Sequence, residues 1–294
     1  MYACSINGLM CSAEDATLSV ADHGLLYGDG VFEGLRFYQK QVFRLYQHLV
    51  RLQDSAKAIN LELPISTDEI VRSIKEVIEA SGLSDGYIRL LVTRGEGAMG
   101  LDPGNCVNPK AIIIVDELAM VAPKARLHGV NVIIASIRRL SVDQLDPRIK
   151  SLNYLNQILA KQEANIAGAD EAILLNQSGR IAEGTADNVF VVRDNQLLTP
   201  PVSEGALDGV TRSVVMDLAR GLGIHCSEAL LASYDLFTAD ECFLTGTGAE
   251  LIPVASISGR ELPPERPVYS RLAGAFRNLV YNPEIESNSV LMTG

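Results

Sequence analysis

The sequence contains no hydrophobic run that approaches the roughly 20 apolar residues of a membrane-spanning helix. Its first residues, Met1-Tyr2-Ala3-Cys4, lack the basic and apolar stretches of a secretion signal. Basic residues are also scarce: the sequence has 25 Lys and Arg but 36 Asp and Glu, which gives a net charge of -11. The electrostatic field of such a negative protein repels polyanions such as nucleic acids. We therefore expect a cytoplasmic protein that binds neither nucleic acid nor membranes, although a local positive pocket can still hold a small anion.

Cysteine and histidine are few and scattered. The five cysteines are odd in number and include no C-x-x-C pair, which favours free thiols in a reducing compartment over a disulfide framework. The four histidines show no metal-ligand spacing, so no metal site is expected. The residues concerned are Cys4, Cys11, Cys106, Cys226, Cys242, His23, His48, His128 and His225.

The 294 residues, of which 47% are hydrophobic, suffice for two domains with cores of their own. Apolar residues recur at helical spacing over residues 44–60. A second helix is predicted to begin near Ser66, which has capping-box spacing to Glu69, and to end at Gly82. The first part of the chain is thus predicted to contain at least two helices.

Residues 87–93 and 111–115 are typical of buried strands. The pattern then lapses around Pro123, so we predict a domain boundary there. The predicted organisation is a small N-terminal domain over 1–118, a linker over 119–126 and a larger C-terminal domain over 127–294.

The predicted C-terminal domain opens with a strand over 130–135 and contains a hairpin over 171–183 with a turn at residues 176–179. A further helix is expected to start near Gly209. An apolar helix follows Lys150, and its predicted apolar face consists of Leu152, Leu155, Ile158 and Leu159. Helices and strands mix without strict alternation, which predicts an α+β fold.

One motif is misleading. The stretch Gly95–Gly100 matches G-x-G-x-x-G and follows a predicted strand, as in a dinucleotide site. That motif works only if a helix starts there, because the helix N-terminal amides must meet the pyrophosphate. Here Pro103 and Gly104 follow directly and indicate a turn. We therefore expect a loop without a nucleotide.

Lys150 and Glu183 are the two residues best suited to covalent cofactor chemistry. A lone lysine is usually a solvated surface charge, but Lys150 lies between Ile149 and Leu152 at the start of an apolar segment. A partly desolvated amine suits a Schiff base. Glu183 is predicted to end a strand, where it could face water or, alternatively, a protonated pyridine nitrogen.

Three further segments could bind an anion. The stretch Gly209–Arg212 opens a helix, and its amides and the Thr211 hydroxyl favour a phosphate as readily as an ordinary cap. Residues 246–248 form a second Gly/Thr turn with the same two interpretations. Arg51, in the middle of a helix, is either an exposed salt-bridge partner or a phosphate ligand.

Taken together, these segments resemble the fold-type IV pyridoxal-phosphate (PLP) enzymes: branched-chain aminotransferases, D-amino-acid aminotransferases and aminodeoxychorismate lyases. The resemblance runs from Tyr27 to Pro253. The matching segments are Tyr27–Arg36, His48–Arg51, Tyr87–Arg89, Lys150–Tyr154, Glu183–Asn188, Gly209–Arg212 and Thr245–Glu250.

The resemblance implies a two-domain enzyme with PLP between the domains, assembled as a homodimer or a higher homo-oligomer. It implies that Lys150 forms the internal aldimine and moves the substrate proton in a ping-pong transamination. Glu183 is expected to hold the pyridine nitrogen and Tyr154 the ring oxygen. The expected phosphate ligands are Arg51, Val210, Thr211 and Thr247.

The segment Tyr87-Ile-Arg89 is most similar to the branched-chain aminotransferases, which implies transfer between a branched-chain L-amino acid and 2-oxoglutarate. Tyr87, with the amides of Thr247 and Gly248, is expected to bind the substrate carboxylate, and Arg89 the side-chain carboxylate of glutamate. An apolar pocket is implied for Phe32 and Tyr154 together with Tyr27 and Leu101 from the partner subunit.

Alternatives remain open at this stage. The segment Lys150-Ser-Leu-Asn is similar to D-amino-acid relatives, but the loop over residues 98–102 lacks the Arg and His of the D-enzymes. A D-amino-acid or (R)-amine transaminase and an aminodeoxychorismate lyase are therefore the nearest alternatives. A non-catalytic small-anion-binding protein is a more distant one.

Overall fold

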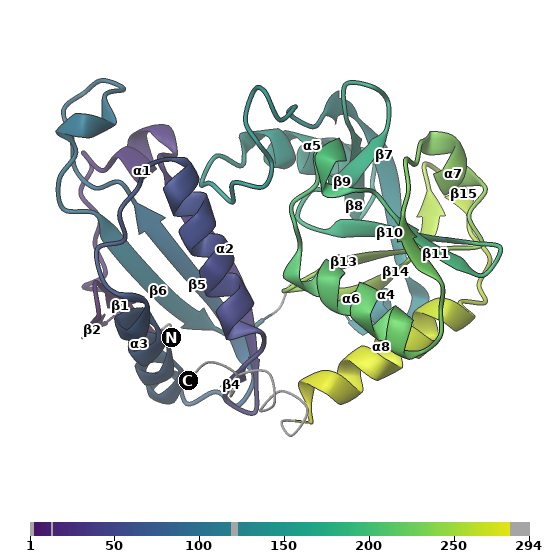
Figure 1. Ribbon diagram of the computed structural model, residues 1–294, viewed down its shortest axis with the longest axis horizontal. Helices are drawn as coiled ribbons and strands as arrows, with labels where there is room; N and C mark the ends of the chain where they lie inside the picture. The colour runs from purple at the N-terminus through teal and green to yellow at the C-terminus, as the bar shows by residue number, and fades with distance from the viewer. Residues whose placement is uncertain (1–2, 13, 119–122, 283–294) are drawn as a thin grey trace. The chain divides into compact units, whose positions relative to one another are not determined.

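The computed structural model describes residues 3–12, 14–118 and 123–282, and these form two compact units. Unit 1 contains the described residues up to Leu118 together with Ile149–Asn153. Unit 2 contains residues 123–148 and 154–282. Each unit has its own sheet (Figure 1).

Unit 1 is built on a six-stranded antiparallel sheet with the order β2-β1-β6-β5-β3-β4. Its strands are β1 (Ala3–Ile6), β2 (Leu9–Cys11), β3 (Gly30–Tyr38), β4 (Gln41–Val42), β5 (Gly86–Thr93) and β6 (Lys110–Asp116). Its helices are α1 (His23–Tyr27), α2 (Leu45–Ala58), α3 (Thr67–Ser81) and a 3-10 turn at Pro103–Asn105.

Helices α2 and α3 cover one face of this sheet (Figure 1). Successive strand residues point to opposite faces, so alternate residues such as Val31, Leu35 and Leu90 turn toward the helices and are fully buried. The predicted caps of α3 are confirmed. The Ser66 hydroxyl accepts from the Glu69 amide at 3.3 Å, and Gly82 ends the helix in the left-handed conformation with φ 70°.

The segment Ile149–Asn153 packs with unit 1, although the sequence placed Lys150 in the C-terminal domain. The Phe32 amide donates to the Lys150 carbonyl at 2.9 Å, and the Leu152 amide donates to the Gly30 carbonyl at 2.9 Å. This antiparallel bridge has Val31 opposite Ser151. The physical reason is that β4 pairs only with Phe37 and Tyr38, at the C-terminal end of β3. The backbone N–H and C=O groups at the N-terminal end of β3 therefore need another hydrogen-bond partner.

Unit 2 is built on a nine-stranded mixed sheet with the order β12-β11-β10-β13-β14-β7-β8-β9, and β15 pairs with β14. Its strands are β7 (Val130–Arg138), β8 (Glu171–Leu175), β9 (Ile181–Gly184), β10 (Asn188–Arg193), β11 (Gln196–Thr199), β12 (Cys226–Glu228), β13 (Glu241–Gly246), β14 (Glu250–Ile257) and β15 (Arg260–Glu261). Its helices are α4 (Pro123–His128), α5 (Leu155–Ile166), α6 (Val210–Gly221), α7 (Ser233–Phe237), α8 (Pro267–Val280) and a 3-10 turn at Val202–Glu204.

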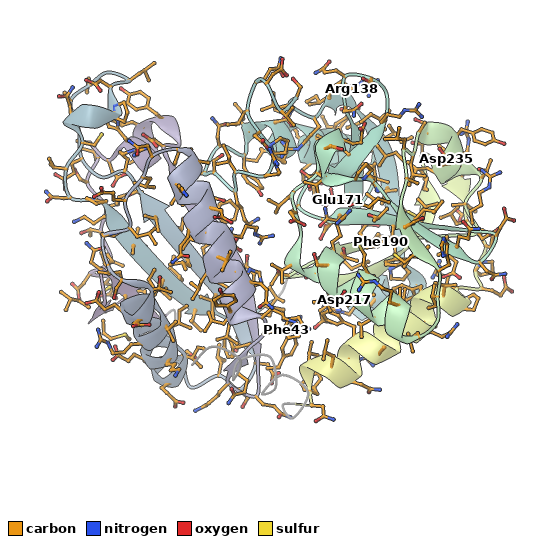
Figure 2. The ribbon with its side chains drawn as sticks, in the orientation of Figure 1. Phe43, Arg138, Glu171, Phe190, Asp217 and Asp235 are labelled. Carbon is orange, nitrogen blue, oxygen red and sulfur yellow. The ribbon has the colours of Figure 1, made fainter. Side chains whose placement is uncertain are left out.

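The predicted hairpin is confirmed as β8 and β9, which pair antiparallel around the turn at Asn176. Phe190 of β10, labelled in Figure 2, stacks on Phe243 of β13 with 5.1 Å between the ring centroids. Helices α6 and α8 pack on β13. Part of the predicted linker, residues 119–122, lies outside the described residues, and the rest begins helix α4.

The apolar face predicted for the helix after Lys150 is not its core face. Leu155, Ile158 and Leu159 of α5 are exposed by 60%, 59% and 41%, and Leu152 precedes the helix. The buried side carries Ala160 and Ala164, because small side chains let α5 lie close to β7 and β8. The stripe of large apolar residues therefore faces outward on this chain.

The described helices include none that is both long and apolar enough to cross a bilayer.

Candidate active site

One face of the β3–β5 pair in unit 1 brings together three residues that the sequence singled out. Phe32 belongs to β3, and Tyr87 and Arg89 lie two residues apart on β5, so all three are on the face opposite α2. The Arg89 guanidinium carbon is 4.7 Å from the centre of the Phe32 ring and 5.3 Å from that of Tyr87. An aromatic surface and a cation therefore lie side by side.

Gly34 makes this arrangement possible. A Cβ atom at residue 34 would lie 2.0 Å from the Tyr87 hydroxyl and 2.8 Å from its ring carbon Cζ. Only a glycine lets the Tyr87 ring lie across β3 at this point. Gly34 belongs to the motif Tyr27–Arg36, but the sequence alone predicted no role for it.

Lys150 is held at the edge of β3 by its backbone. Its amide donates to the Ser55 hydroxyl of α2 at 3.1 Å, and its carbonyl accepts from the Phe32 amide at 2.9 Å. Its Nζ lies 4.5 Å from the centre of the Phe32 ring. The Phe32 ring thus has the Lys150 amine and the Arg89 guanidinium within cation–π distance.

Arg51 is part of a buried network between α2 and β3. Its Nε and Nη2 donate to the two carboxylate oxygens of Glu33 at 2.7 and 2.8 Å, a bidentate pair. The Nδ1 atom of His48 lies 2.8 Å from the same carboxylate. Glu33 and His48 are almost completely buried, and the Arg51 side chain is 13% exposed. Arg51 is therefore neither the exposed salt-bridge partner nor a freely moving side chain.

Burial and charge act in opposite directions on this network. Burial by itself raises the pKa of Glu33, but the charge and hydrogen bonds of Arg51, joined by those of His48, lower it to about 2. Burial lowers the pKa of His48 from 6.5, although Glu33 opposes the shift. The result is an ionised Glu33, a neutral His48 and a guanidinium that is fixed in place.

Tyr27 and the loop that carries Leu101 contact each other in unit 1. The Gly100 amide donates to the Tyr27 hydroxyl at 3.1 Å, and Tyr27 and Leu101 are exposed by 39% and 80%. The loop over residues 95–100 leads into a 3-10 turn rather than an α-helix, as expected for a G-x-G-x-x-G match without nucleotide geometry.

In unit 2, Glu183 is the centre of a second buried network. Arg139 donates from Nε to one carboxylate oxygen of Glu183, and the Leu207 amide donates to the other, both at 2.8 Å. Arg139 also donates to the Gly205 carbonyl at 3.2 Å, and its side chain is 7% exposed, like that of Glu183. The side-chain oxygen of Gln157 on α5, in the orientation of its side-chain amide that satisfies both groups, accepts from both terminal nitrogens of Arg139.

The motif Glu183–Asn188 connects the remaining predicted segments of unit 2. Asn188 faces Thr245 across the β10–β13 pair, directly before the turn that contains Thr247 and Gly248. The side-chain amide of Asn188 donates from Nδ2 to the Leu207 carbonyl at 3.0 Å. A Cβ atom at Gly209 would lie 2.0 Å from Asn188 Oδ1, so the start of α6 packs closely against the motif Glu183–Asn188.

The start of α6 suits an anion. Gly209 is its N-cap and offers no side chain to the first amides, Val210 is the first helical residue, and Thr211 is buried. Tyr154 is the N-cap of α5, the helix whose Gln157 lies on Arg139. The predicted residues of unit 2 therefore come from segments that touch one another.

Sequence reasoning missed Glu33 and Arg139. A signal for Glu33 existed, because a single acidic residue lies within the mostly apolar and aromatic strand Gly30–Tyr38, and such a residue needs a buried partner. No comparable signal marked Arg139, which follows a strand end and lies 44 residues from Glu183.

The chain belongs to the class IV aminotransferases, whose family model matches residues 30–257. A relative from Methanocaldococcus jannaschii, named provisionally as a branched-chain-amino-acid aminotransferase, is 49% identical over 87% of this chain and 88% of its own length. The D-alanine aminotransferase of Bacillus licheniformis is 35% identical over 87% of this chain and 88% of its own.

Solved structures agree with this family. The branched-chain amino acid aminotransferase of Thermobaculum terrenum, in its PLP-bound holo-form, has a TM-score of 0.88 and 31% identity over 97% of this chain and 96% of that one. The predictions of a fold-type IV fold and a PLP-dependent aminotransferase are confirmed.

Proposed function

We propose that this aminotransferase exchanges the amino group between a branched-chain L-amino acid (leucine, isoleucine or valine) and 2-oxoglutarate in a ping-pong cycle. The observation that carries the proposal is the Phe32 ring with the Lys150 amine and the Arg89 guanidinium near it. The similarity to enzymes named for branched-chain amino acids supports the same substrate class.

One pocket must accept two kinds of side chain for this exchange. The Phe32 ring offers apolar surface to an aliphatic side chain, whereas Arg89 can pair with the second carboxylate of 2-oxoglutarate or glutamate. The Tyr87 hydroxyl, held over Gly34, would bind the carboxylate common to all substrates, together with the amides of Thr247 and Gly248.

The residues present fit PLP. The uncapped start of α6 and the fixed guanidinium of Arg51 suit a phosphate, so Arg51, Val210, Thr211 and Thr247 are the proposed ligands. Glu183 would hold the pyridine nitrogen, because its carboxylate is oriented by Arg139 and the Leu207 amide. Tyr154 would hold the ring oxygen.

When bound, PLP supplies an electron sink for cleavage of the substrate Cα–H bond. Lys150 would hold it through its amine, and Lys150 Nζ would then take the proton from the substrate Cα and return it. The contacts of the Lys150 backbone with Ser55 and Phe32 would keep the main chain from which this amine extends at the same position throughout.

We further propose that the enzyme is a cytoplasmic homodimer or a higher homo-oligomer. Tyr27, Leu101 and the α5 stripe with Leu155 and Ile158 expose large apolar surfaces that an isolated chain would leave in water. In such a dimer, Tyr27 and Leu101 would wall the partner's substrate pocket. Light scattering of the holoenzyme at micromolar concentration tests this, and a monomer would overturn it.

The substrate proposal is tested by incubating the holoenzyme with leucine and 2-oxoglutarate and measuring glutamate. Arg89→Met should raise KM for 2-oxoglutarate on the order of tenfold or more and change KM for leucine much less, because a charge-assisted pair is lost for the diacid alone. Arg72→Met, on the exposed side of α3, is the matched control. Equal effects on both substrates contradict the role of Arg89, and absence of glutamate contradicts the reaction.

D-Amino-acid transamination is the second candidate, because a D-alanine aminotransferase is also similar to this chain. Supplying D-alanine and 2-oxoglutarate and determining the configuration of the glutamate formed separates the two. Accumulation of D-glutamate would replace the L-amino-acid proposal.

A further inference from the structure

The N-terminal hairpin of unit 1 places two cysteines directly opposite each other. Asn7 and Gly8 form the two-residue turn, with φ of 49° and 80°, the left-handed values that hairpin turns require. Ile6 then pairs with Leu9, and two pairs further Cys4 faces Cys11. Seven positions separate the two cysteines in the sequence, so they escape any search for a C-x-x-C motif.

Their sulfur atoms are in contact. Cys4 Sγ lies 3.3 Å from Cys11 Sγ, and it also donates to the Cys11 carbonyl at 3.2 Å. Directly opposed residues of an antiparallel pair have Cα atoms about 4.5 to 5.5 Å apart, within the range that a disulfide spans. A bond between them therefore needs little movement of the backbone.

The two strands of the hairpin are anchored differently, because β1 pairs with β6 from Ala3 to Ile6, whereas the edge strand β2 pairs with β1 alone. The Asn7 amide donates to the Ala111 carbonyl at 2.8 Å, and the Asn7 side chain bonds to Ala111 and Pro109 at the start of β6. Cys4 and Cys11 lie at the opposite end, where the edge strand β2 finishes. A covalent bond there would fix the end of the edge strand β2 to β1.

We propose that Cys4 and Cys11 are a dithiol site that a small disulfide oxidises reversibly to an intrachain disulfide. Cys11 is half-buried and Cys4 is 2% exposed, so Cys11 reacts first. Its thiolate attacks one sulfur of oxidised glutathione, the S–S bond breaks, and one glutathione thiolate leaves and takes up a proton.

Cys4 then attacks the Cys11 sulfur, gives up its proton, and displaces the second glutathione. The protein loses two hydrogen atoms, and one oxidised glutathione becomes two reduced ones. Burial, and then the hydrogen bond with Cys11, raise the pKa of the Cys4 thiol in the reduced protein to about 11. Burial therefore keeps a thiolate at Cys4 scarce, which slows this second step.

Met10 makes a sharp test available, because cyanogen bromide cuts after methionine and Met10 lies between the two cysteines. The full-length holoenzyme is treated with oxidised glutathione, which spares methionine, alkylated, and cleaved. The expected result is that fragment 2–10 stays attached to fragment 11–99 until a phosphine reductant releases it. Oxidation should also raise the melting temperature by a few degrees.

Release of fragment 2–10 without reductant, or its attachment to any other cysteine or to a second chain, overturns the proposal. In Cys4→Ser, Cys11 should keep one glutathione, because no neighbouring thiol displaces it. If Cys4→Ser fails to fold, Cys11→Ser is the second variant, and its fragment 2–10 should be released without reductant. The matched control Cys226→Ser, which removes another half-buried thiol, should oxidise like the parent protein. Transamination by the reduced cysteine variants should equal that of the parent.

Discussion

Replacing Glu33 by glutamine should destabilise the protein at neutral pH far more than an exposed ion pair could explain. The change removes one charge without altering side-chain size, and it leaves the Arg51 guanidinium and His48 facing a neutral amide. In the parent protein Glu33 accepts two hydrogen bonds from Arg51 and contacts His48 in a site without solvent.

The magnitude follows from the pKa of Glu33, which is lowered from 4.5 to about 2 in the folded protein. That difference corresponds to about 3 kcal/mol of stability at pH 7 that depends on the charge. Because the folded pKa is the lower one, the contribution is complete well above pH 4.5 and is lost as the pH falls toward 2. Between pH 7 and pH 3.5 about 1.4 kcal/mol should disappear.

The assay is urea unfolding of the parent, Glu33→Gln and a control from pH 7 to pH 3.5, followed by circular dichroism. The control is Glu79→Gln, which removes the exposed pair with Lys40 at 2.8 Å and should cost below about 0.5 kcal/mol. A Glu33→Gln penalty under about 1 kcal/mol at pH 7, or one that does not shrink on acidification, refutes the reasoning.

Three other outcomes are expected. Gly34→Ala should displace Tyr87 and raise KM for all substrates on the order of tenfold while the protein stays folded, and unchanged kinetics would argue against a role for Tyr87. His48→Gln should flatten the loss of stability below pH 6.5, because burial lowers the pKa of His48 and the unfolded chain takes the proton first; parallel curves would contradict this. Arg139→Met should cost about 3–5 kcal/mol in urea unfolding by leaving the Glu183 charge buried without its partner, whereas a smaller loss would show that other contacts suffice.

The elements that the sequence predicted well are those whose determinants lie within a few residues. Ser66, Glu69 and Gly82 define both ends of α3, and the turn at Asn176 defines the β8–β9 hairpin. A capping side chain or a turn residue acts on its own neighbours, so its effect survives in any tertiary context.

The failures concern contacts between distant segments. Periodicity identified α5 but not which of its sides is buried. Ala160 and Ala164 lie on the buried side because of their small size rather than their hydrophobicity. Of the candidate site, the residues carried by family motifs were named from the sequence, but the partners that orient them were not. Glu33 and Arg139 act through geometry that only the folded chain provides.

The attachment of Ile149–Asn153 to β3 has a consequence for biosynthesis. A nascent chain leaves unit 1 at Leu118 and returns to it only with Ile149, after β7 has already been made. The edge of β3 must therefore stay open on the ribosome until the later segment emerges. Among the described residues of unit 1, those around Lys150 are synthesised last, so the amine can reach its position beside Phe32 only after all six strands of that sheet have been made.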